Sequence, residues 1–354
     1  MSVLEAPVPA ASGTELTAYF EGRAAEVDAG GGAGVRDAIA FVADRGLLDR
    51  ERTDLDASIG LIAAIAWSDL SSAFSLWCHR MAIAYLDTLP PAAWLRREVL
   101  PRLCSGEMLG STALAGATAH YLSGALLPLT FERDGDEVVL NGRLPWASNL
   151  LPEFVSVTAA VDAHDPQRTL IVAFDGRAPG VEVDPFPPLL ALQATGSSSL
   201  RFRDARLGAD WIVSDDLDGF VRHVLPTFLL LQCAFCAGLA RRGLDEAAEA
   251  LGGQREVLRP ALEALGARRA AAELQLQTFA GRPDREAIPL RDLLALRLEW
   301  AGLAGEAVGL ELKAAGGRGY LSTSGTARRL REAAFLPIQA PTEVQLRWAL
   351  SRFA

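Results

Sequence analysis

The chain has few cysteines and no dense cluster of positive charge. Its 354 residues include four cysteines, and the formal net charge is -10. Four cysteines in a chain of this length do not make a disulfide scaffold, which favours a reducing, cytoplasmic setting. Because no Lys/Arg-rich patch with interleaved aromatic residues occurs, the sequence predicts no nucleic-acid partner. The acidic balance does not exclude anionic cofactors, because local groups rather than net charge bind phosphate.

Long hydrophobic runs are also missing. The first twenty residues lack a basic start followed by an apolar core, so we expect no secretory signal there. The longest apolar stretch, Leu225–Ala240, contains Pro226 and Gln232. It is shorter than the ~20 residues of a membrane span and is typical of a buried helix. The sequence therefore predicts no membrane partner.

What the chain does have is a large apolar content arranged in three blocks. Hydrophobic residues make up 50% of the sequence and charged residues 22%, which is typical of a globular protein. Apolar residues recur at helical spacing in residues 1–109 and again in 215–354, whereas 110–214 carries short alternating runs. This order predicts an α+β fold with an N-terminal helical domain (1–109), a central β-barrel or sandwich (110–214) and a C-terminal helical bundle (215–354).

Local signals place several elements within these blocks. Asp54 or Asp56 is expected to cap a helix, and Pro90-Pro91 to end the next one. Turns are expected at 134–136 and at Asn141-Gly142. Four strands are predicted at 137–140, 154–158, 170–174 and 199–202. Two long helices are predicted at 255–279 and 290–315.

Three stretches carry a resemblance to a known family. The first reads GDEVVLNGRLPWASN (135–149) and the second ATGSSSLRFRDARLGADW (194–211). The third joins GGRGY (316–320), REA (331–333) and TEVQLR (342–347) without a gap. In this order they resemble the acyl-CoA dehydrogenase motifs "GDxxxxNGxKxWITN", "RxSxTxxxxFxxVxVPxxxxL" and "GGxGY…RDA…GTxEIQR". The α, β, α order of the chain is also the layout of that family.

The resemblance implies a bound flavin, either FAD or FMN. Trp146 is expected to offer an apolar face to the flavin ring, and Ser148 to place a hydroxyl donor near it. Gly316 and Gly317 let backbone N–H groups approach a phosphate, and Thr342 matches a family threonine that touches the flavin. The alternative reading is structural: a buried strand tryptophan beside a turn serine, and a Gly-Gly helix break.

The usual catalytic carboxylate of the family is absent. It stands immediately before a Gly-Thr pair, where this chain has Ala340 followed by Pro341. Some relatives place the base on the first C-terminal helix, but the matching position lies near Phe228, without a carboxylate in the adjoining turn. Glu343 is therefore the nearest acidic candidate. His79 and His120 are further catalytic candidates, because related flavin monooxygenases use a histidine instead of the missing glutamate.

Other family features also depart from the pattern. The substrate loop, usually "TEPxAGSD", reads ALAGATAH over 113–120, so its polar residues are gone. The "RxxFG" segment that grips the adenine half of FAD is missing near 252–255. Lys313 replaces a usual glutamine before the Gly-Gly turn. Arg328 and Arg331 are expected to be structural, with a local ion pair to Glu332.

Several other patterns favour structural roles. Cys233 and Cys236 have CxxC spacing in an apolar helix, which is typical of core cysteines rather than of a metal or redox site. The glycine run 30–34 lacks the strand and Lys-Ser/Thr of a phosphate loop. The stretch 215–219 lacks further calcium ligands and is expected to be a domain junction. His164 and His223 are expected to be a solvated loop residue and the start of the helical bundle.

Three functions follow from these residues. The first is a flavin-dependent oxidoreductase acting on an acyl thioester or similar small molecule, with acyl-CoA or a carrier-bound acyl group as partner. The second is a reduced-flavin monooxygenase, favoured by the missing glutamate and adenine grip. The third is a binding protein that has lost the flavin. A homodimer or homotetramer through the C-terminal helices is expected.

Overall fold

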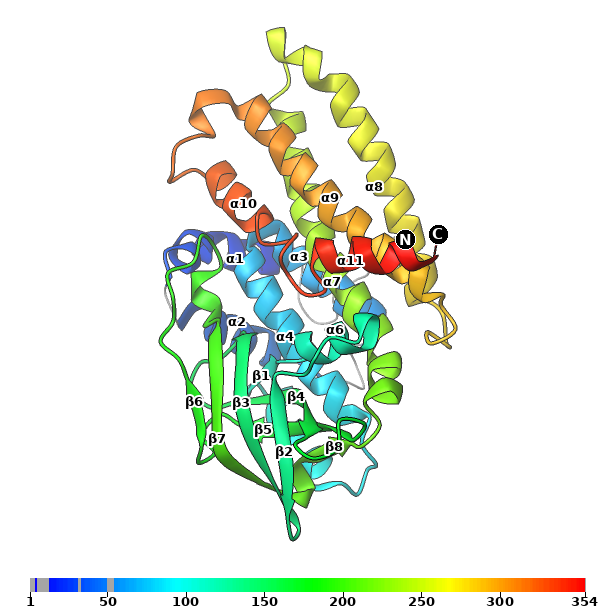
Figure 1. The fold of residues 1–354 in the computed structure, drawn as a ribbon. Helices are drawn as coiled ribbons and strands as arrows, with labels where there is room; N and C mark the ends of the chain where they lie inside the picture. Colours follow the sequence, from blue (N-terminus) through cyan, green and yellow to red (C-terminus); the bar gives the residue numbers. More distant parts are fainter. Residues whose placement is uncertain (1–3, 5–12, 31–32, 50–53, 354) are drawn as a thin grey trace.

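The N-terminal part of the molecule is helical. The computed structural model describes residues 4, 13–30, 33–49 and 54–353, and its ribbon is shown in Figure 1. The helices of this part are α1 (Gly13–Asp28), α2 (Ala33–Ala43), α3 (Leu55–Ser68), α4 (Leu70–Asp87), the short π-helix η2 (Leu95–Val99) and α5 (Leu100–Cys104). The expected cap is confirmed for Asp54, whose side chain accepts a hydrogen bond from Ala57 N at 2.8 Å. Helix α4 ends at Asp87, before Pro90.

The central part forms one mixed sheet. Its strands are β1 (Leu109–Thr112), β2 (Leu129–Asp134), β3 (Glu137–Ala147), β4 (Phe154–Asp162), β5 (Thr169–Asp175), β6 (Val181–Val183), β7 (Ser198–Gly208) and β8 (Ile212–Ser214). The strand order is β6-β7-β3-β2-β4-β5-β8, and β1 pairs with β4 in parallel. Each of the four predicted strands lies within one of these. Helix α6 (Ala115–Ser123) separates β1 from β2 and occupies most of the expected substrate loop.

The turn expected at Asn141-Gly142 is wrong, because these residues lie inside β3. Gly142 adopts a φ of 129°, and the pairing of β3 with β7 shifts between Leu140 and Gly142. The Asn141 amide donates to the Asp204 carboxylate at 3.1 Å and accepts from the Asp204 backbone at 2.9 Å. A bulge of this kind bends a strand without ending it. Strand β3 therefore continues to Ala147 and delivers Trp146 to the far end of the sheet.

The C-terminal part consists of long helices. They are α7 (Leu217–Glu249), α8 (Arg259–Ala280), α9 (Leu290–Ala315), α10 (Gly325–Ala333) and α11 (Glu343–Leu350). Short 3-10 turns accompany the sheet and these helices: η3 (Gln193–Thr195), η4 (Ala209–Trp211), η5 (Gly253–Leu258), η6 (Gly316–Arg318) and η7 (Ser351–Phe353). In Figure 1, α8, α9 and α10 lie at the end of the molecule opposite the sheet, and α7 passes between the two ends. The predicted fold class is confirmed by this arrangement.

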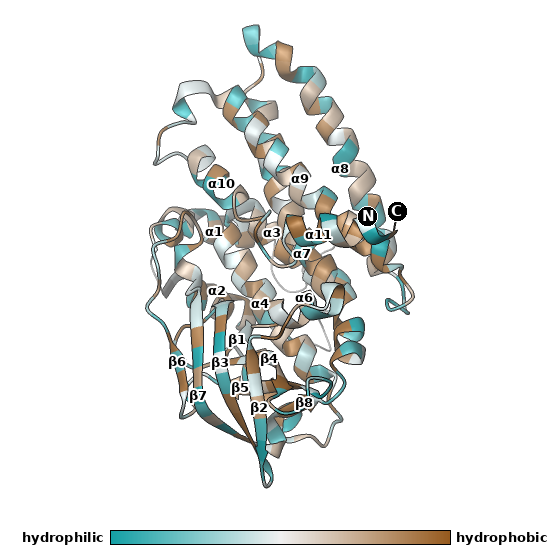
Figure 2. Ribbon diagram, in the orientation of Figure 1, coloured by the Kyte–Doolittle hydropathy of each residue, from teal (hydrophilic) through white to brown (hydrophobic). Residues whose placement is uncertain are grey.

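The longest apolar helix lies in the protein core. Helix α7 is the only helix of the described residues that is long and apolar enough to cross a membrane, and 89% of its most apolar window is buried by the rest of the protein. In Figure 2 much of α7 carries the hydrophobic colour, whereas α8 mixes hydrophilic and hydrophobic residues. The expectation of a buried helix at 225–240 is confirmed.

Close contact between α3 and α7 depends on one glycine. A Cβ atom on Gly238 would lie 2.2 Å from the Ala63 carbonyl oxygen, which belongs to the backbone and cannot move aside cheaply. We expect Gly238→Ala to lower the free energy of unfolding by about 1–3 kcal/mol, as overpacking does. Gly309→Ala is the matched control, because a Cβ there meets nothing within 4 Å and alanine is the better helix former by about 1 kcal/mol. Urea unfolding measures both; equal stability of the two variants would contradict the packing.

Candidate functional site

Trp146 is presented to solvent by an irregular strand end. The register of β3 against β7 shifts between Leu144 and Ala147, two residues that are both buried. The bulge leaves Pro145 and Trp146 facing outward in succession, and 56% of Trp146 is exposed. The structural alternative of a buried strand tryptophan is therefore wrong. An indole this accessible at the end of a sheet is suited to contact a planar ligand.

Ser148 begins a chain of three hydroxyl groups. Its Oγ lies 2.7 Å from Ser197 Oγ, which lies 2.7 Å from Thr195 Oγ1. Thr195 in turn donates to the Leu192 carbonyl at 2.7 Å. The first two motifs of the sequence thus meet here, because Ser148 follows β3 whereas Thr195 and Ser197 precede and flank β7.

The carbonyl at the end of this chain fixes its direction. A carbonyl oxygen only accepts, so the Thr195 hydroxyl donates to Leu192 and must accept from Ser197. Ser197 has then used its hydrogen and accepts from Ser148. Ser148 consequently presents an acceptor to a ligand, whereas the sequence reading expected a donor. Ser197 and Thr195 cause this change from donor to acceptor. They lie close to Ser148 in space but 49 and 47 positions away from it in the chain.

Asn149 locks this strand end to the helices, a role that the sequence analysis did not assign. It is fully buried and has a positive φ of 61°. Its side-chain amide donates to the Ser75 carbonyl of α4 at 2.8 Å and to the Gly110 carbonyl of β1 at 2.9 Å. Asparagine tolerates this left-handed conformation better than most residues. The position of Ser148 is therefore set by the neighbouring Asn149.

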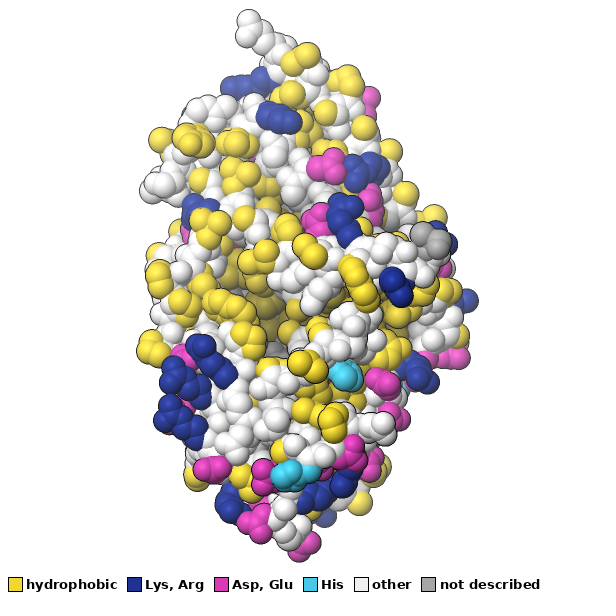
Figure 3. Space-filling view, viewed as in Figure 1, with side chains coloured by type: hydrophobic (Ala, Val, Ile, Leu, Met, Phe, Trp, Pro, Cys, Tyr) yellow, Lys and Arg dark blue, Asp and Glu magenta, His cyan; other side chains and the backbone are white. Residues whose placement is uncertain are grey.

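Trp146 also borders an open pocket of about 510 Å³. The walls come from the outer face of β3 and β7 and from the segment after β6. They comprise Arg143, Pro145, Trp146, Asp184, Pro185, Pro187, Ser199 and Arg201. Figure 3 shows a second feature nearby, a hollow lined by hydrophobic side chains between the sheet and the C-terminal helices.

The Gly316-Gly317 turn leaves its backbone accessible. Helix α9 ends at Ala315, and Gly316 adopts a positive φ of 62°. A Cβ on Gly316 or Gly317 would meet nothing within 4 Å, whereas one on Gly319 would lie 2.8 Å from the Ala315 Cβ. The first two glycines thus leave room for a ligand to approach the backbone. Among the described residues, no hydrogen bond joins this turn to the strand of Trp146.

Thr342 and Glu343 start helix α11. The Thr342 hydroxyl accepts from Gln345 N at 3.2 Å, and the Gln345 side chain accepts from Thr342 N at 2.8 Å, which is a capping box. The cap uses the acceptor function of Thr342 and leaves its O–H to donate. Glu343 is paired with Arg347 one turn along the helix, at 2.8 Å. This ion pair directs the Glu343 carboxylate along its own helix.

The Ala340 carbonyl is bound by one buried side chain, which a second buried side chain orients. It accepts from Gln232 Nε2 at 2.9 Å, and Gln232 Oε1 accepts from Arg297 Nε at 2.8 Å. Arg297 is fully buried and also donates to the Leu336 carbonyl and to Gln339. The loop that bears Ala340 is therefore rigidly supported. Its methyl group has no proton-accepting function.

The structure places His79 inside the helical core rather than at a surface. His79 is fully buried, with Nε2 at 2.9 Å from the Leu103 carbonyl. Its Nδ1 accepts from Gly110 N at 2.9 Å. Burial lowers the pKa of His79 to about 4. Because both ring nitrogens bind backbone groups, neither is free to take a proton from a substrate.

His120 is held by its own helix end. Its Nδ1 lies 2.8 Å from the Ala125 carbonyl, just past the end of α6. The helix is closed by Gly124, which has a positive φ of 69° and donates to the His120 carbonyl. The ring is partly exposed and keeps one nitrogen without a hydrogen bond to any described residue.

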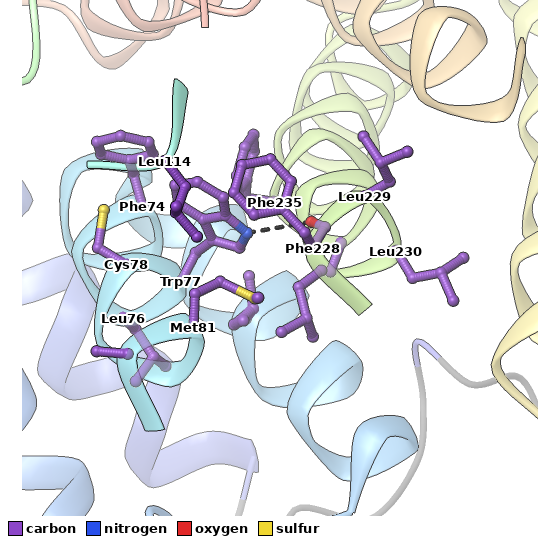
Figure 4. Close-up of a cluster of buried hydrophobic side chains, with 14 of the residues drawn as sticks. Phe74, Leu76, Trp77, Cys78, Met81, Leu114, Phe228, Leu229, Leu230 and Phe235 are labelled. Carbon is purple, nitrogen blue, oxygen red and sulfur yellow. Dashed lines mark hydrogen bonds between the residues drawn. The ribbon is translucent and has the colours of Figure 1, made fainter. Parts of the chain in front are cut away.

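The region around Phe228 is filled by aromatic rings. Figure 4 shows Trp77 of α4 packed between Phe74 and Phe228, with its Nε1 donating to the Phe228 carbonyl at 3.3 Å. The ring centroids of Trp77 and Phe228 are 4.8 Å apart, and those of Phe74 and Phe335 are 4.9 Å apart. This close packing is suited to hold α4, α7 and the segment after α10 together.

The remaining patterns have structural roles in the described part of the chain. Cys233 and Cys236 are buried thiols whose pKa values are raised by burial, and no cluster of metal-ligating side chains occurs among the described residues. Asp216 caps α7 by accepting from Gly219 N at 2.8 Å. His223 pairs with Glu286 at 2.7 Å. Of the glycine run at 30–34, residues 31 and 32 lie outside the described residues.

The chain is similar to known proteins in sequence and in fold, although no family model matches it. The probable acyl-CoA dehydrogenase YngJ of Bacillus subtilis (strain 168) is 22% identical over 261 residues, which are 70% of this chain and 68% of YngJ. The structure of butyryl-CoA dehydrogenase from Megasphaera elsdenii matches with a TM-score of 0.82 at 16% identity, covering 96% of this chain and 97% of that one. The prolyl acyl carrier protein oxidase AnaB matches with a TM-score of 0.81 at 16% identity, covering 96% and 98%.

Proposed function

We propose that this chain, which has the acyl-CoA dehydrogenase fold and resembles that family in sequence, is a flavin-dependent oxidoreductase. Its substrate is an acyl thioester or a similar small molecule, free as acyl-CoA or bound to a carrier. The observation that carries the proposal is the strand end at Trp146 and Ser148. An indole that is 56% exposed stands there beside a hydroxyl of fixed polarity, which fits the flat, heteroatom-edged ring of a flavin.

The chain's own residues would share the work of holding the cofactor. Trp146 contacts the ring, Ser148 accepts a hydrogen bond from its edge, and Thr342 donates one. The open backbone at Gly316 and Gly317 would receive the pyrophosphate of FAD. Bound flavin, FAD or FMN, supplies two-electron redox chemistry that protein side chains lack. The setting that we propose is the cytoplasm.

These residues do not identify the general base that a dehydrogenase reaction needs. Ala340 has no carboxylate, Glu343 is paired with Arg347, and His79 binds two backbone groups. His120 keeps one ring nitrogen available. It is the remaining candidate for proton transfer among the three that the sequence suggested.

One observation favours the monooxygenase alternative. The hydroxyl chain makes Ser148 a hydrogen-bond acceptor. Reduced flavin carries a hydrogen on N5, whereas N5 of the oxidised ring has none. A resident acceptor therefore stabilises the reduced form relative to the oxidised form. An enzyme that takes up reduced flavin and oxygen would benefit from this polarity and needs no substrate-facing carboxylate.

The visible spectrum of the purified protein tests the proposal. A yellow protein with flavin absorption supports it, and colourless protein that takes up neither FAD nor FMN on titration would leave a binding protein that has lost the cofactor. Bleaching by acyl-CoA without oxygen supports the dehydrogenase. Tighter binding of reduced than of oxidised flavin, with turnover that needs oxygen, supports the monooxygenase.

Trp146→Ala should weaken flavin binding by about 5- to 150-fold, since stacking on an aromatic side chain is worth about 1–3 kcal/mol. The measurement is the dissociation constant from fluorescence titration. Trp348→Ala serves as the control, because that indole is also exposed (46%) but lies on α11. Unchanged flavin affinity in Trp146→Ala would show that the ring does not bind on β3.

We propose that the chain assembles as a homodimer or homotetramer through its C-terminal helices. Val257, just before α8, is 79% exposed, and Leu274 on α8 is 66% exposed. Contiguous exposed apolar surface is typical of an interface, and we propose that these two side chains contribute to one. We expect light scattering at micromolar concentration to give a dimer or tetramer mass, and Leu274→Glu to lower it. A monomer mass for the unmodified protein would contradict this assembly.

A further inference from the structure

Two arginines stand directly opposite each other on the outer face of the sheet. Arg143 of β3 and Arg201 of β7 are paired residues in the antiparallel register. Their side chains remain 59% and 42% exposed. Like charges in this position repel each other. An internal counter-charge or a bound anion would relieve this repulsion.

Asp184 supplies only part of that counter-charge. Its carboxylate lies 2.8 Å from Arg143 Nη2 and 2.9 Å from Arg201 Nη2, and it also accepts from the Ser199 hydroxyl. The hydrogen bond from Ser199 and the two guanidinium groups hold the pKa of Asp184 below its ordinary value. Glu182 lies opposite Arg201 on β6 but pairs with Arg203 at 3.8 Å. Three guanidinium groups therefore face two carboxylates, and a net positive charge remains. Nη1 of Arg143 and Nη1 of Arg201 have no hydrogen-bond partner among the described residues.

The same pocket carries an aromatic wall. Trp146 lies three positions from Arg143 along β3, and Pro145, Pro185 and Pro187 complete the apolar lining of the 510 Å³ space. Figure 3 shows Lys and Arg side chains gathered on this side of the sheet, beside the central hollow. A positively charged end and an indole end within one pocket match a ligand that is anionic at one end and planar at the other.

We infer that Arg143 and Arg201 bind the phosphoryl group of an organic phosphate whose planar ring stacks on Trp146. Guanidinium forks match the tetrahedral oxygens of a phosphate, and their charge-assisted hydrogen bonds are the strong ones. Asp184 contacts both guanidinium groups, so part of their ordering precedes binding. The ligand is either the flavin itself, through its ribityl phosphate, or a separate nucleotide.

The inference rests on the proposed function where it concerns the flavin, since both use Trp146. The two sources of the phosphate are distinguished by comparing each phosphorylated compound with its own unphosphorylated form. FMN is compared with riboflavin, and AMP with adenosine, by calorimetric titration of the full chain. The arginine variants are Arg143→Gln and Arg201→Gln. Arg203→Gln is the matched control, because Arg203 also lies on β7 but is 3.8 Å from Glu182 and outside the pocket.

We expect FMN or AMP to bind tighter than its unphosphorylated form, and each pocket variant to weaken that binding by about tenfold or more. Arg203→Gln should keep the affinity within about twofold, and riboflavin or adenosine should respond to none of the three changes. Loss confined to FMN identifies the flavin phosphate, and loss confined to AMP identifies a separate nucleotide. Thermal melting confirms that the variants fold.

Two results would overturn the site. One is equal affinity for the phosphorylated and unphosphorylated compounds, including no binding of either. The other is an equal loss in Arg203→Gln, which would mean a general effect of surface charge. If riboflavin binds as well as FMN, the proposed flavin function survives without this phosphate site. If AMP binds tighter than adenosine, loses affinity in the two pocket variants and no flavin binds, the phosphate site is supported and the proposed flavin function is not.

Discussion

Glu311→Ala is expected to lower the free energy of unfolding by about 3–5 kcal/mol, the usual cost of leaving one member of a buried ion pair alone. Glu311 of α9 and Arg329 of α10 have side chains that are only 1% and 5% exposed. Arg329 Nε donates to Glu311 at 2.9 Å and Nη2 donates at 2.5 Å, a two-pronged contact. Burial alone would lower the pKa of Arg329, but the hydrogen bond to Glu311 raises it. Removing the Glu311 carboxylate leaves this buried guanidinium with only the partly exposed Glu246, which lies 3.5 Å away.

Chemical denaturation of the variant and of a matched control measures this effect. Glu306→Ala is the control, since Glu306 also lies on α9 and pairs with Arg268, but its side chain is 53% exposed. An exposed pair of this kind contributes about 0–1 kcal/mol. Replacing both buried partners, as Glu311→Leu with Arg329→Met, should recover most of the lost stability. Equal losses of unfolding free energy in Glu311→Ala and Glu306→Ala would show that the buried pair stabilises the fold no more than the exposed pair does.

The overall architecture was readable from the sequence because its signals are local. Apolar residues at helical spacing predicted the two helical parts, and alternating runs predicted four strands that the structure contains. The cap at Asp54 depends on residues within one turn, so it was also accessible. The bulge at Gly142 could not be predicted. The Asn-Gly pair is typical of a turn, but here Asn141 is held within β3 by hydrogen bonds to Asp204 on the neighbouring strand β7.

The site was only partly readable because its chemistry depends on partners distant in the chain. Trp146 and Ser148 were named from their motif, but the polarity of Ser148 is set by Ser197 and Thr195. His79 looked like a catalytic candidate because no local signal reveals that Leu103 and Gly110 occupy its ring. The pairing of Arg143 with Arg201 requires the strand register.

The clearest chemical prediction concerns position 340. The unmodified protein should show little conventional acyl-CoA dehydrogenation, because Ala340 supplies no base and general bases contribute about 10²–10⁴-fold in rate. Ala340→Glu together with Pro341→Gly restores the family pattern. In the unmodified protein Gln232 donates to the Ala340 carbonyl and Arg297 donates to Gln232, so the carboxylate would be introduced on a loop that buried side chains hold. We expect acyl-CoA-dependent flavin reduction to rise by about 10²–10⁴-fold in the double variant.

The measurement is anaerobic flavin bleaching by saturated acyl-CoA in protein loaded with flavin. Ala340→Gln with Pro341→Gly is the matched control, since glutamine has the size of glutamate but does not take a proton at neutral pH. A gain with glutamate and none with glutamine assigns the effect to the carboxylate. Turnover of the unmodified protein at ordinary enzyme rates of about 1–10³ s⁻¹ would contradict the prediction. His120, which keeps one ring nitrogen available, would then be the first residue to replace.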